Sequence, residues 1–153
     1  KMLDQKDHLL LNLLQENSRI SASEAGEELG LSVPAASERI KKLLEGGYIK
    51  KFTAQLDSKK LGLDLTAFIS VDSSSSSNYE DIVEQSKKNN SVLECHSVTG
   101  EGSHLLKIRV QNSSELESLL SNIQGWPGVV RTHTWVVLST FKESIKLNIK
   151  IKD

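Results

Sequence analysis

Apolar residues between positions 1 and 47 recur at the three- and four-residue intervals of a helix. Polar residues that can cap a helix stand before these stripes, namely Asp4, Ser21 and Ser32, and Ser21 begins an S-x-x-E capping box. The pattern therefore predicts three helices. Two of them carry the apolar stripes Leu10, Leu13, Leu14 and Ile40, Leu43, Leu44.

A glycine turn connects the second predicted helix to the third. Gly30 is placed to end the second helix in a left-handed conformation, and Pro34 in the next first turn needs no helical N–H partner. Two helices joined at Gly30-Leu31 form the corner of a helix-turn-helix. Gly26 lies where close packing would leave room only for a small side chain. Such corners also occur in proteins that do not bind DNA.

The pattern changes to a two-residue period after Gly46-Gly47. Residues 48–57 alternate like a strand and are expected to form a wing or hinge between two domains. Beyond them the predicted elements follow the order β-α-β-β-α-β of a ferredoxin-like fold. Strands are expected over 65–71, 92–98, 104–110 and 129–138, a helix around 79–86, and another from the S-x-x-E box Ser114–Glu117.

The predicted fold class is α+β, with four parts. These are a helix-turn-helix domain over 1–47, a wing or hinge strand and linker over 48–64, a βαββαβ domain over 65–141, and a tail over 142–153. Residues 145–151 alternate with period two, so the tail is expected to be a strand that pairs within the chain or across a dimer. The sheet face without helices, with Leu93, Cys95 and Leu105, is expected to meet a partner subunit.

Charge is nearly balanced overall, with a formal net charge of -1, but it is uneven along the chain. Between residues 39 and 60 there are seven basic residues and two acidic ones. Such a segment can neutralise phosphates, although a solvated helix and hairpin would have the same composition. No apolar run approaches the roughly 20 residues of a membrane span, so no membrane partner is expected.

Other kinds of site are not supported. The single cysteine, Cys95, excludes an internal disulfide and fits a cytoplasmic protein. Cys95 and the adjacent His96 would point to opposite strand faces, so no metal site is expected together with His104 and His133. No P-loop and no nucleophile–base arrangement is present, so we expect neither an enzyme nor a cofactor. The strand over 104–110 lacks the aromatics of an RNA-binding sheet.

The order of these pieces resembles the Lrp/AsnC family (leucine-responsive / asparagine-synthase regulators) of bacterial and archaeal transcription factors. The resemblance covers nearly the whole chain and rests on LDQKDHLLLNLLQENSRIS, LGLS, ERIKKLLEGGYIKKFTAQLDSKKLGL, LECHSVTG and WPGVVRTHTWVVLS. It implies a winged helix-turn-helix followed by an amino-acid-sensing domain. It also implies dimers that assemble as an octamer of four dimers, with a small effector at subunit contacts.

By this resemblance the helix over 32–44 is the recognition helix, and its partner is double-stranded DNA. Small side chains at Ala35, Ala36 and Ser37 would let it approach the bases, with thymine methyls against the alanines. An alternative for Arg39 is a structural ion pair with a first-helix acid such as Asp7. The expected DNA-binding residues are Ser32, Pro34, Ala35, Ser37, Glu38, Arg39, Lys41, Lys42, Lys50 and Lys51.

The family's effector turn carries a glycine followed by an acidic, aromatic, acidic pattern. Here the glycine and the first acid are kept, while the aromatic and the second acid are missing. The turn can still hold a carboxylate on backbone N–H groups, but the chain is expected to bind either a different ligand or none. The expected effector residues are Gly100, Glu101, Gly102, Ser103, His104, Thr132 and Thr134.

The sequence thus predicts a cytoplasmic, sequence-specific DNA-binding regulator modulated by an amino acid or a related small molecule. The alternative is an oligomeric sensor or scaffold whose helix-turn-helix is degenerate and acts through protein contacts. Salt separates the two, because DNA binding weakens steeply as salt rises and an apolar protein interface does not.

Overall fold

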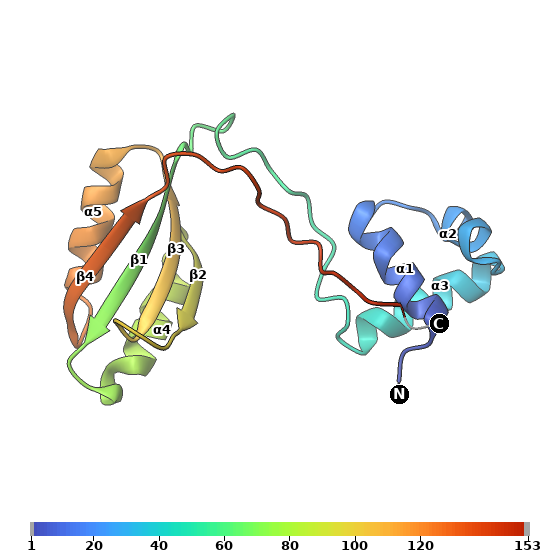
Figure 1. The fold of residues 1–153 in the computed structure, drawn as a ribbon, viewed down its shortest axis with the longest axis horizontal. Helices are drawn as coiled ribbons and strands as arrows, with labels where there is room; N and C mark the ends of the chain where they lie inside the picture. Colours follow the sequence, from blue (N-terminus) through green and yellow to red (C-terminus); the bar gives the residue numbers. More distant parts are fainter. Residues whose placement is uncertain (1, 152–153) are drawn as a thin grey trace. The chain divides into compact units, whose positions relative to one another are not determined.

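The computed structural model describes residues 2–151 and divides into two compact units. One unit comprises the chain up to Gln55 together with the tail from Lys142 onward, and the other comprises Leu56–Phe141. Figure 1 shows three helices in the first unit and a sheet with two long helices in the second. Each unit has its own apolar core.

The first unit contains α1 (Gln5–Glu16), α2 (Ala22–Leu29) and α3 (Val33–Glu45). Each helix begins directly after its predicted N-cap residue. Asp4 and Ser21 each form a capping box, and the Ser32 side chain accepts a hydrogen bond from a backbone N–H in the first turn of α3. Four buried residues form the core: Leu10, Leu14, Ala25 and Leu43. The three predicted helices are thereby confirmed.

The turn between α2 and α3 depends on two glycines. Gly30 ends α2 with φ 64° and ψ 38°, a left-handed conformation that other residues adopt only with strain. A Cβ at Gly26 would lie 2.6 Å from the carbonyl oxygen of Leu31. The predicted close packing at Gly26 is confirmed. Gly26 packs against the backbone of the turn between α2 and α3.

The second unit has the predicted β-α-β-β-α-β order. Its four-stranded antiparallel sheet has the strand order β2-β3-β1-β4, and α4 and α5 cover one face (Figure 1). A short 3-10 turn, Ser76–Asn78, precedes α4. The elements are β1 (Leu65–Ser73), α4 (Tyr79–Lys88), β2 (Val92–Ser97), β3 (His104–Val110), α5 (Ser113–Gln124) and β4 (Val129–Val136).

The start of α5 differs from the predicted Ser114–Glu117 capping box. The N-cap is Asn112, whose side chain accepts a 3.0 Å bond from the backbone N–H of Glu115. Ser114 already lies inside the helix, where its carbonyl accepts the hydroxyl of Ser118. Because asparagine is at least as good an N-cap as serine, the helix begins earlier than the S-x-x-E pattern indicates.

A β-bulge in β2 corrects one prediction about the uncovered sheet face. The register of β2 on β3 shifts between Val92 and Glu94, which makes Leu93 an extra residue. This reverses the alternation, so Cys95 lies opposite Leu106 and packs against the covered core. The placement of Cys95 on the uncovered face was therefore wrong. Leu105, paired with His96, does lie on that face.

Two predicted strands do not form within the chain. Residues 48–57 and the tail over 145–151 have no strand partner in the part of the chain that the structure describes. A strand needs a second strand to satisfy its backbone groups, and alternation alone does not supply one. Pairing across a dimer remains a prediction for the tail.

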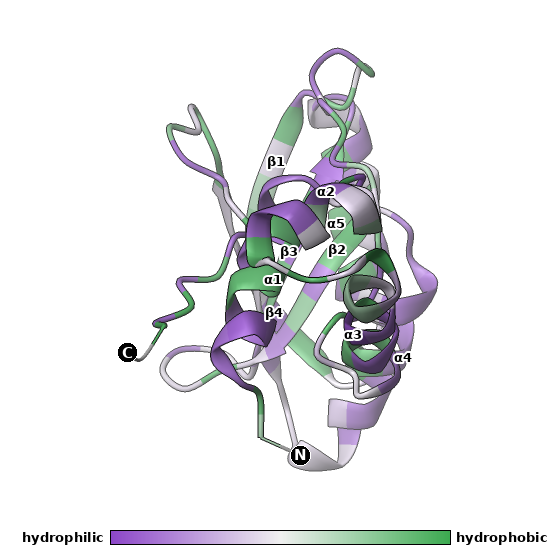
Figure 2. Cartoon of the chain, turned by 90° about the vertical axis from the view of Figure 1, so that its right-hand side faces the viewer, coloured by the Kyte–Doolittle hydropathy of each residue, from purple (hydrophilic) through white to green (hydrophobic). Residues whose placement is uncertain are grey.

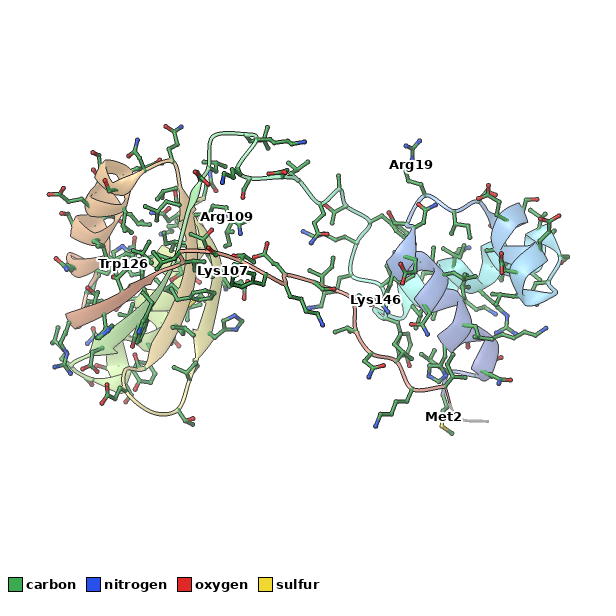
Figure 3. The ribbon with its side chains drawn as sticks, turned by 45° about the horizontal axis from the view of Figure 1, so that its top comes forward. Met2, Arg19, Lys107, Arg109, Trp126 and Lys146 are labelled. Carbon is green, nitrogen blue, oxygen red and sulfur yellow. The ribbon has the colours of Figure 1, made fainter. Side chains whose placement is uncertain are left out.

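The tail is fastened to α1 instead. The side-chain amide of Gln15 donates to the carbonyl of Leu147 at 3.1 Å and accepts from the N–H of Leu147 at 2.6 Å. Lys146, labelled in Figure 3, forms an ion pair with Glu16. One glutamine side chain thus replaces the peptide group of a neighbouring strand.

Candidate nucleic-acid interface and effector turn

The recognition helix predicted from the sequence, α3, has one side in the core and one side in solvent. Ala36 and Leu43 are buried, and Ile40 packs against the core that contains Leu43. In Figure 2 the ribbon of α3 carries both purple and green residues, as expected for a helix with a polar and an apolar side. The solvent side, which we call the outer face of α3, consists of Val33, Pro34, Ser37, Glu38, Lys41 and Lys42.

The two lysines of the outer face are paired only loosely. Lys41 lies 3.9 Å from Glu45 and Lys42 lies 3.9 Å from Glu38, both one helical turn apart. Exposed pairs of this kind contribute about 0.3–0.5 kcal/mol each. They can therefore exchange their carboxylate partners for phosphate oxygens at little cost.

Arg39 has a different role from the lysines. Its Nη1 lies 2.8 Å from an oxygen of Asp4 and 2.9 Å from an oxygen of Asp7, at the start of α1. The Arg39 hydrogen bond holds the pKa of Asp4 at about 2, and Asp4 in turn raises the pKa of Arg39. The alternative expectation, an ion pair with Asp7, is confirmed. Arg39 thus links α3 to α1, and its contact with DNA stays a prediction.

The small residues near the start of α3 are less available than the sequence predicts. Ala36 is fully buried, so the expected contact of its methyl group with thymine is excluded by packing. Ala35 is half-buried, and the Ser32 hydroxyl accepts a 3.2 Å bond from the N–H of Ala35. Ser37 and Glu38 are exposed. Lys50 and Lys51 are exposed in the irregular segment that follows the helix.

The predicted effector turn connects β2 to β3 and folds against β1. The N–H of Ser103 donates to the carbonyl of Val71 at 2.8 Å, and the hydroxyl of Ser70 donates to the carbonyl of Glu101 at 3.2 Å. Gly102 has φ 83°, and a Cβ there would lie 2.2 Å from the Ser70 oxygen. Contact with Ser70 therefore requires glycine at 102, and it fixes the position of the turn.

His104 lies directly behind the turn on the covered side of the sheet. It is 2% exposed, its Nδ1 lies 2.8 Å from the Ser103 hydroxyl oxygen, and its ring stands nearly perpendicular to that of Tyr79 at a centroid distance of 5.0 Å. Burial lowers the pKa of His104 below its ordinary value of 6.5. The imidazole is therefore neutral at physiological pH. It packs beneath the turn as a buried side chain.

The two predicted effector threonines do not join the turn. Thr132 is opposite Val71 and Thr134 is opposite Ile69, and both Val71 and Ile69 face the helices. The Thr132 hydroxyl accepts a 3.2 Å bond from Gln124 of α5. Strand alternation places Thr132 and Thr134 on the covered side of the sheet and Arg131, His133 and Trp135 on the uncovered face. A part for the two threonines in effector binding stays a prediction.

Sequence reasoning missed two residues of these sites. Ser70 fixes the effector turn, and its only signal was a hydroxyl that interrupts the apolar run of β1. Val33, the first residue of α3, is half exposed although it is apolar. No sequence pattern separates it from a core valine, because Ile40 and Leu43 on the same helix do enter the core.

The uncovered sheet face combines apolar and charged side chains. Phe68 of β1 is opposite Trp135 of β4, and Leu105 lies on the same face. Lys107 and Arg109, labelled in Figure 3, project from β3 on this side, where Lys107 pairs with Glu94 at 3.6 Å and Arg109 donates to Thr66 at 3.0 Å. The face thus has an apolar part beside a polar network.

Residues 2–151 contain no group of three or more His, Cys, Asp or Glu residues that could hold a metal ion. Within the same range, no helix has the length and apolar character needed to cross a membrane.

Comparison with known proteins agrees with these two units. Residues 3–50 match winged helix-turn-helix DNA-binding domains, and residues 66–147 match the Lrp/AsnC ligand binding domain. A helix-turn-helix transcriptional regulator with a ligand-binding domain is therefore the class that the fold and the matches define. The chain belongs to the Lrp/AsnC family.

Several relatives match over nearly their full length. The HTH-type transcriptional regulator FL11 of Pyrococcus horikoshii is 38% identical over 148 residues, which cover 97% of each chain. The leucine-responsive regulatory protein of Escherichia coli is 35% identical over 157 aligned positions, covering 99% of this chain and 94% of that protein. A transcriptional regulator from Neisseria meningitidis, solved with L-Met, has a TM-score of 0.91 at 29% identity, covering 96% and 97% of the two chains.

Proposed function

We propose that the chain regulates transcription by placing the outer face of α3 in the major groove of DNA. The observation that carries the proposal is the division of α3 into a packed side and an exposed side with two loosely paired lysines. In helix-turn-helix proteins the residues at the start of the second helix meet base edges. Lys41, Lys42, Lys50 and Lys51 then contact phosphates, which position the protein without reading sequence.

The effector in this proposal is an amino acid or a related small acid bound at the turn over residues 100–103. Ser70 and Val71 hold this turn in one position, and Gly100, which has positive φ and open space where a Cβ would stand, leaves the backbone accessible to a ligand. A related regulator has been solved with L-Met, and another relative is leucine-responsive. The missing second acid favours recognition of the carboxylate over recognition of the amino group.

A second copy of the chain covers the uncovered sheet face in the proposed assembly. Phe68, Leu105 and Trp135 provide the apolar contact area, and exposed apolar patches of this kind mark interfaces. A dimer also presents two α3 helices to two half-sites of the DNA. An octamer of four such dimers binds with several modestly basic helix-turn-helix units at once, which increases the overall affinity through avidity.

The test is selection of bound fragments from a random DNA pool at physiological salt, with and without a mixture of amino acids. The wild-type chain should enrich a palindromic motif, and the amino acids should change the enrichment. The double variant Lys41→Ala, Lys42→Ala should then weaken binding on all sequences. It should also reduce the slope of log affinity against log salt by roughly one for each lost phosphate contact.

Lys87 and Lys88, adjacent exposed lysines near the end of α4, provide the matched control. Their double alanine variant should keep the wild-type affinity and salt slope. Equal binding by the Lys41, Lys42 variant and by wild type would contradict the placement of α3. Enrichment that amino acids do not change would contradict the effector, and no enrichment at all would support the scaffold alternative.

A further inference from the structure

Val33 and Pro34 form an apolar tip at the start of α3. Val33 is 50% exposed and is absent from the core that encloses Leu43 and Ala25, and Pro34 beside it is exposed as well. Neither side chain can donate or accept a hydrogen bond, and proline has no backbone N–H. This apolar tip is continuous with the polar outer face formed by Ser37, Glu38 and the two lysines.

The apolar tip is the main exposed apolar surface at the start of α3, because the neighbouring small residues are buried or partly buried. The methyl of Ala36 is fully buried, and Ala35 is half-buried. The Ser32 hydroxyl is occupied by the helix cap. Apolar contact with DNA bases at the start of α3 therefore falls to Val33 and Pro34.

The major groove offers these side chains one apolar feature, the C5-methyl group of thymine. Most other groups on the major-groove edges are hydrogen-bond donors or acceptors, which an apolar side chain would leave without a partner. We propose that the apolar tip, Val33 and Pro34, reads thymine methyl groups and so fixes A·T pairs at defined positions of each half-site. The inference rests on the proposed function, because it requires α3 to enter the major groove.

The local backbone holds the tip in one orientation. Ser32 caps the helix, the pyrrolidine ring fixes φ at Pro34, and Val33 is β-branched and therefore stiff at χ1. The N–H of Leu31 is bonded to Gly26, which fixes the preceding turn. Little conformational entropy is lost when such a surface meets a ligand, so even a small methyl contact contributes to selectivity.

The test begins with the motif that the wild-type chain selects from random DNA. Each thymine of that motif is replaced in turn by deoxyuridine, which lacks only the C5-methyl group, and affinities are measured for wild type and for Val33→Ala. At one or more positions, deoxyuridine should weaken wild-type binding about fourfold, the value for one buried carbon. The same replacement should change binding of Val33→Ala by much less, since the contact is already lost.

Two variants keep the result specific. Val33→Thr preserves the shape but replaces one methyl group by a hydroxyl, so it should fold normally and lose part of the preference for thymine over deoxyuridine. Leu44→Ala removes a 38%-exposed apolar side chain at the other end of α3 and should keep the full preference. Circular dichroism of each variant verifies that α3 is still formed.

If deoxyuridine changes the affinity of wild type and of Val33→Ala equally at every position, the inference is wrong. The proposed function would still hold in that case, because the wild-type chain has selected a DNA motif. A wild-type chain that selects no motif would overturn both. Loss of the deoxyuridine effect in Leu44→Ala as well would also contradict the inference, because the readout would not be local to the tip.

Discussion

His104 begins β3 with its imidazole buried between the sheet and the start of α4. Its surroundings are Val71, the Ser103 hydroxyl and the edge of Tyr79, and none of these carries a charge that could stabilise an imidazolium. Burial therefore lowers the pKa of His104 below 6.5 in the folded chain. In the unfolded chain the imidazole is in water and its pKa is about 6.5.

This difference makes the stability of the sheet unit depend on pH. Well above pH 6.5 His104 is neutral in both states, and the free energy of unfolding is fully retained. As the pH falls below 6.5 the unfolded chain takes up the proton first, so the free energy of unfolding decreases until the lower folded-state pKa is passed. Urea unfolding followed by tryptophan fluorescence between pH 8 and pH 5 should show this decline.

His104→Gln should be less stable at pH 8, because it loses the packing of the ring, but its decline toward pH 5 should be much smaller. The same decline in His104→Gln and in wild type would assign the pH dependence to other groups.

Single side chains were the least predictable part of the site. Arg39 had the charge of a phosphate contact, but Asp4 and Asp7, more than thirty residues earlier, bind its guanidinium. Cys95 was placed by simple alternation, and one inserted residue in β2 reversed its face. Both placements depend on information that is not local: an ion pair formed in the folded unit and a register set by the neighbouring strand.

Elements with local signals were predictable, and elements that need a partner were not. The helices of the first unit start at Asp4, Ser21 and Ser32, because capping is decided within four residues. The segments over 48–57 and 145–151 alternate as clearly as β3 does, yet within residues 2–151 neither has a strand beside it. A period-two pattern specifies which residues share a face, and it does not supply the second strand.

The tail contact with α1 can be tested through its two hydrogen bonds to Gln15. Each such bond contributes roughly 1 kcal/mol, so Gln15→Ala should increase the open fraction of the tail by a factor of about five or more. Cleavage by trypsin after Lys146, followed by mass spectrometry, should accelerate accordingly. Gln5→Ala, an exposed glutamine on the same helix, should cleave at the wild-type rate. Unchanged cleavage in Gln15→Ala would mean that the ion pair of Lys146 with Glu16 holds the tail alone.

The whole molecule contains two cores of unequal size. The core of the sheet unit has eleven buried residues, from Ala67 to Trp126, while the helical unit has four. Stability increases with the apolar area removed from water, so the helical unit should unfold first. A regulator can use this difference, since the unit that contacts DNA can loosen while the effector unit remains folded.

Both tryptophans, Trp126 and Trp135, lie in the sheet unit, whereas helices occur in both units. Tryptophan fluorescence therefore reports on the sheet unit alone, and circular dichroism at 222 nm reports on both. In urea the circular dichroism transition should begin at a lower concentration than the fluorescence transition. Each core truncation should reduce the unfolding free energy of its own unit by roughly 2–5 kcal/mol. Leu43→Ala should therefore shift only the early part of the dichroism transition to lower urea concentration. Ile108→Ala should shift the fluorescence midpoint to lower urea concentration. Coincident curves that both variants shift together would show that the two cores unfold as one cooperative unit.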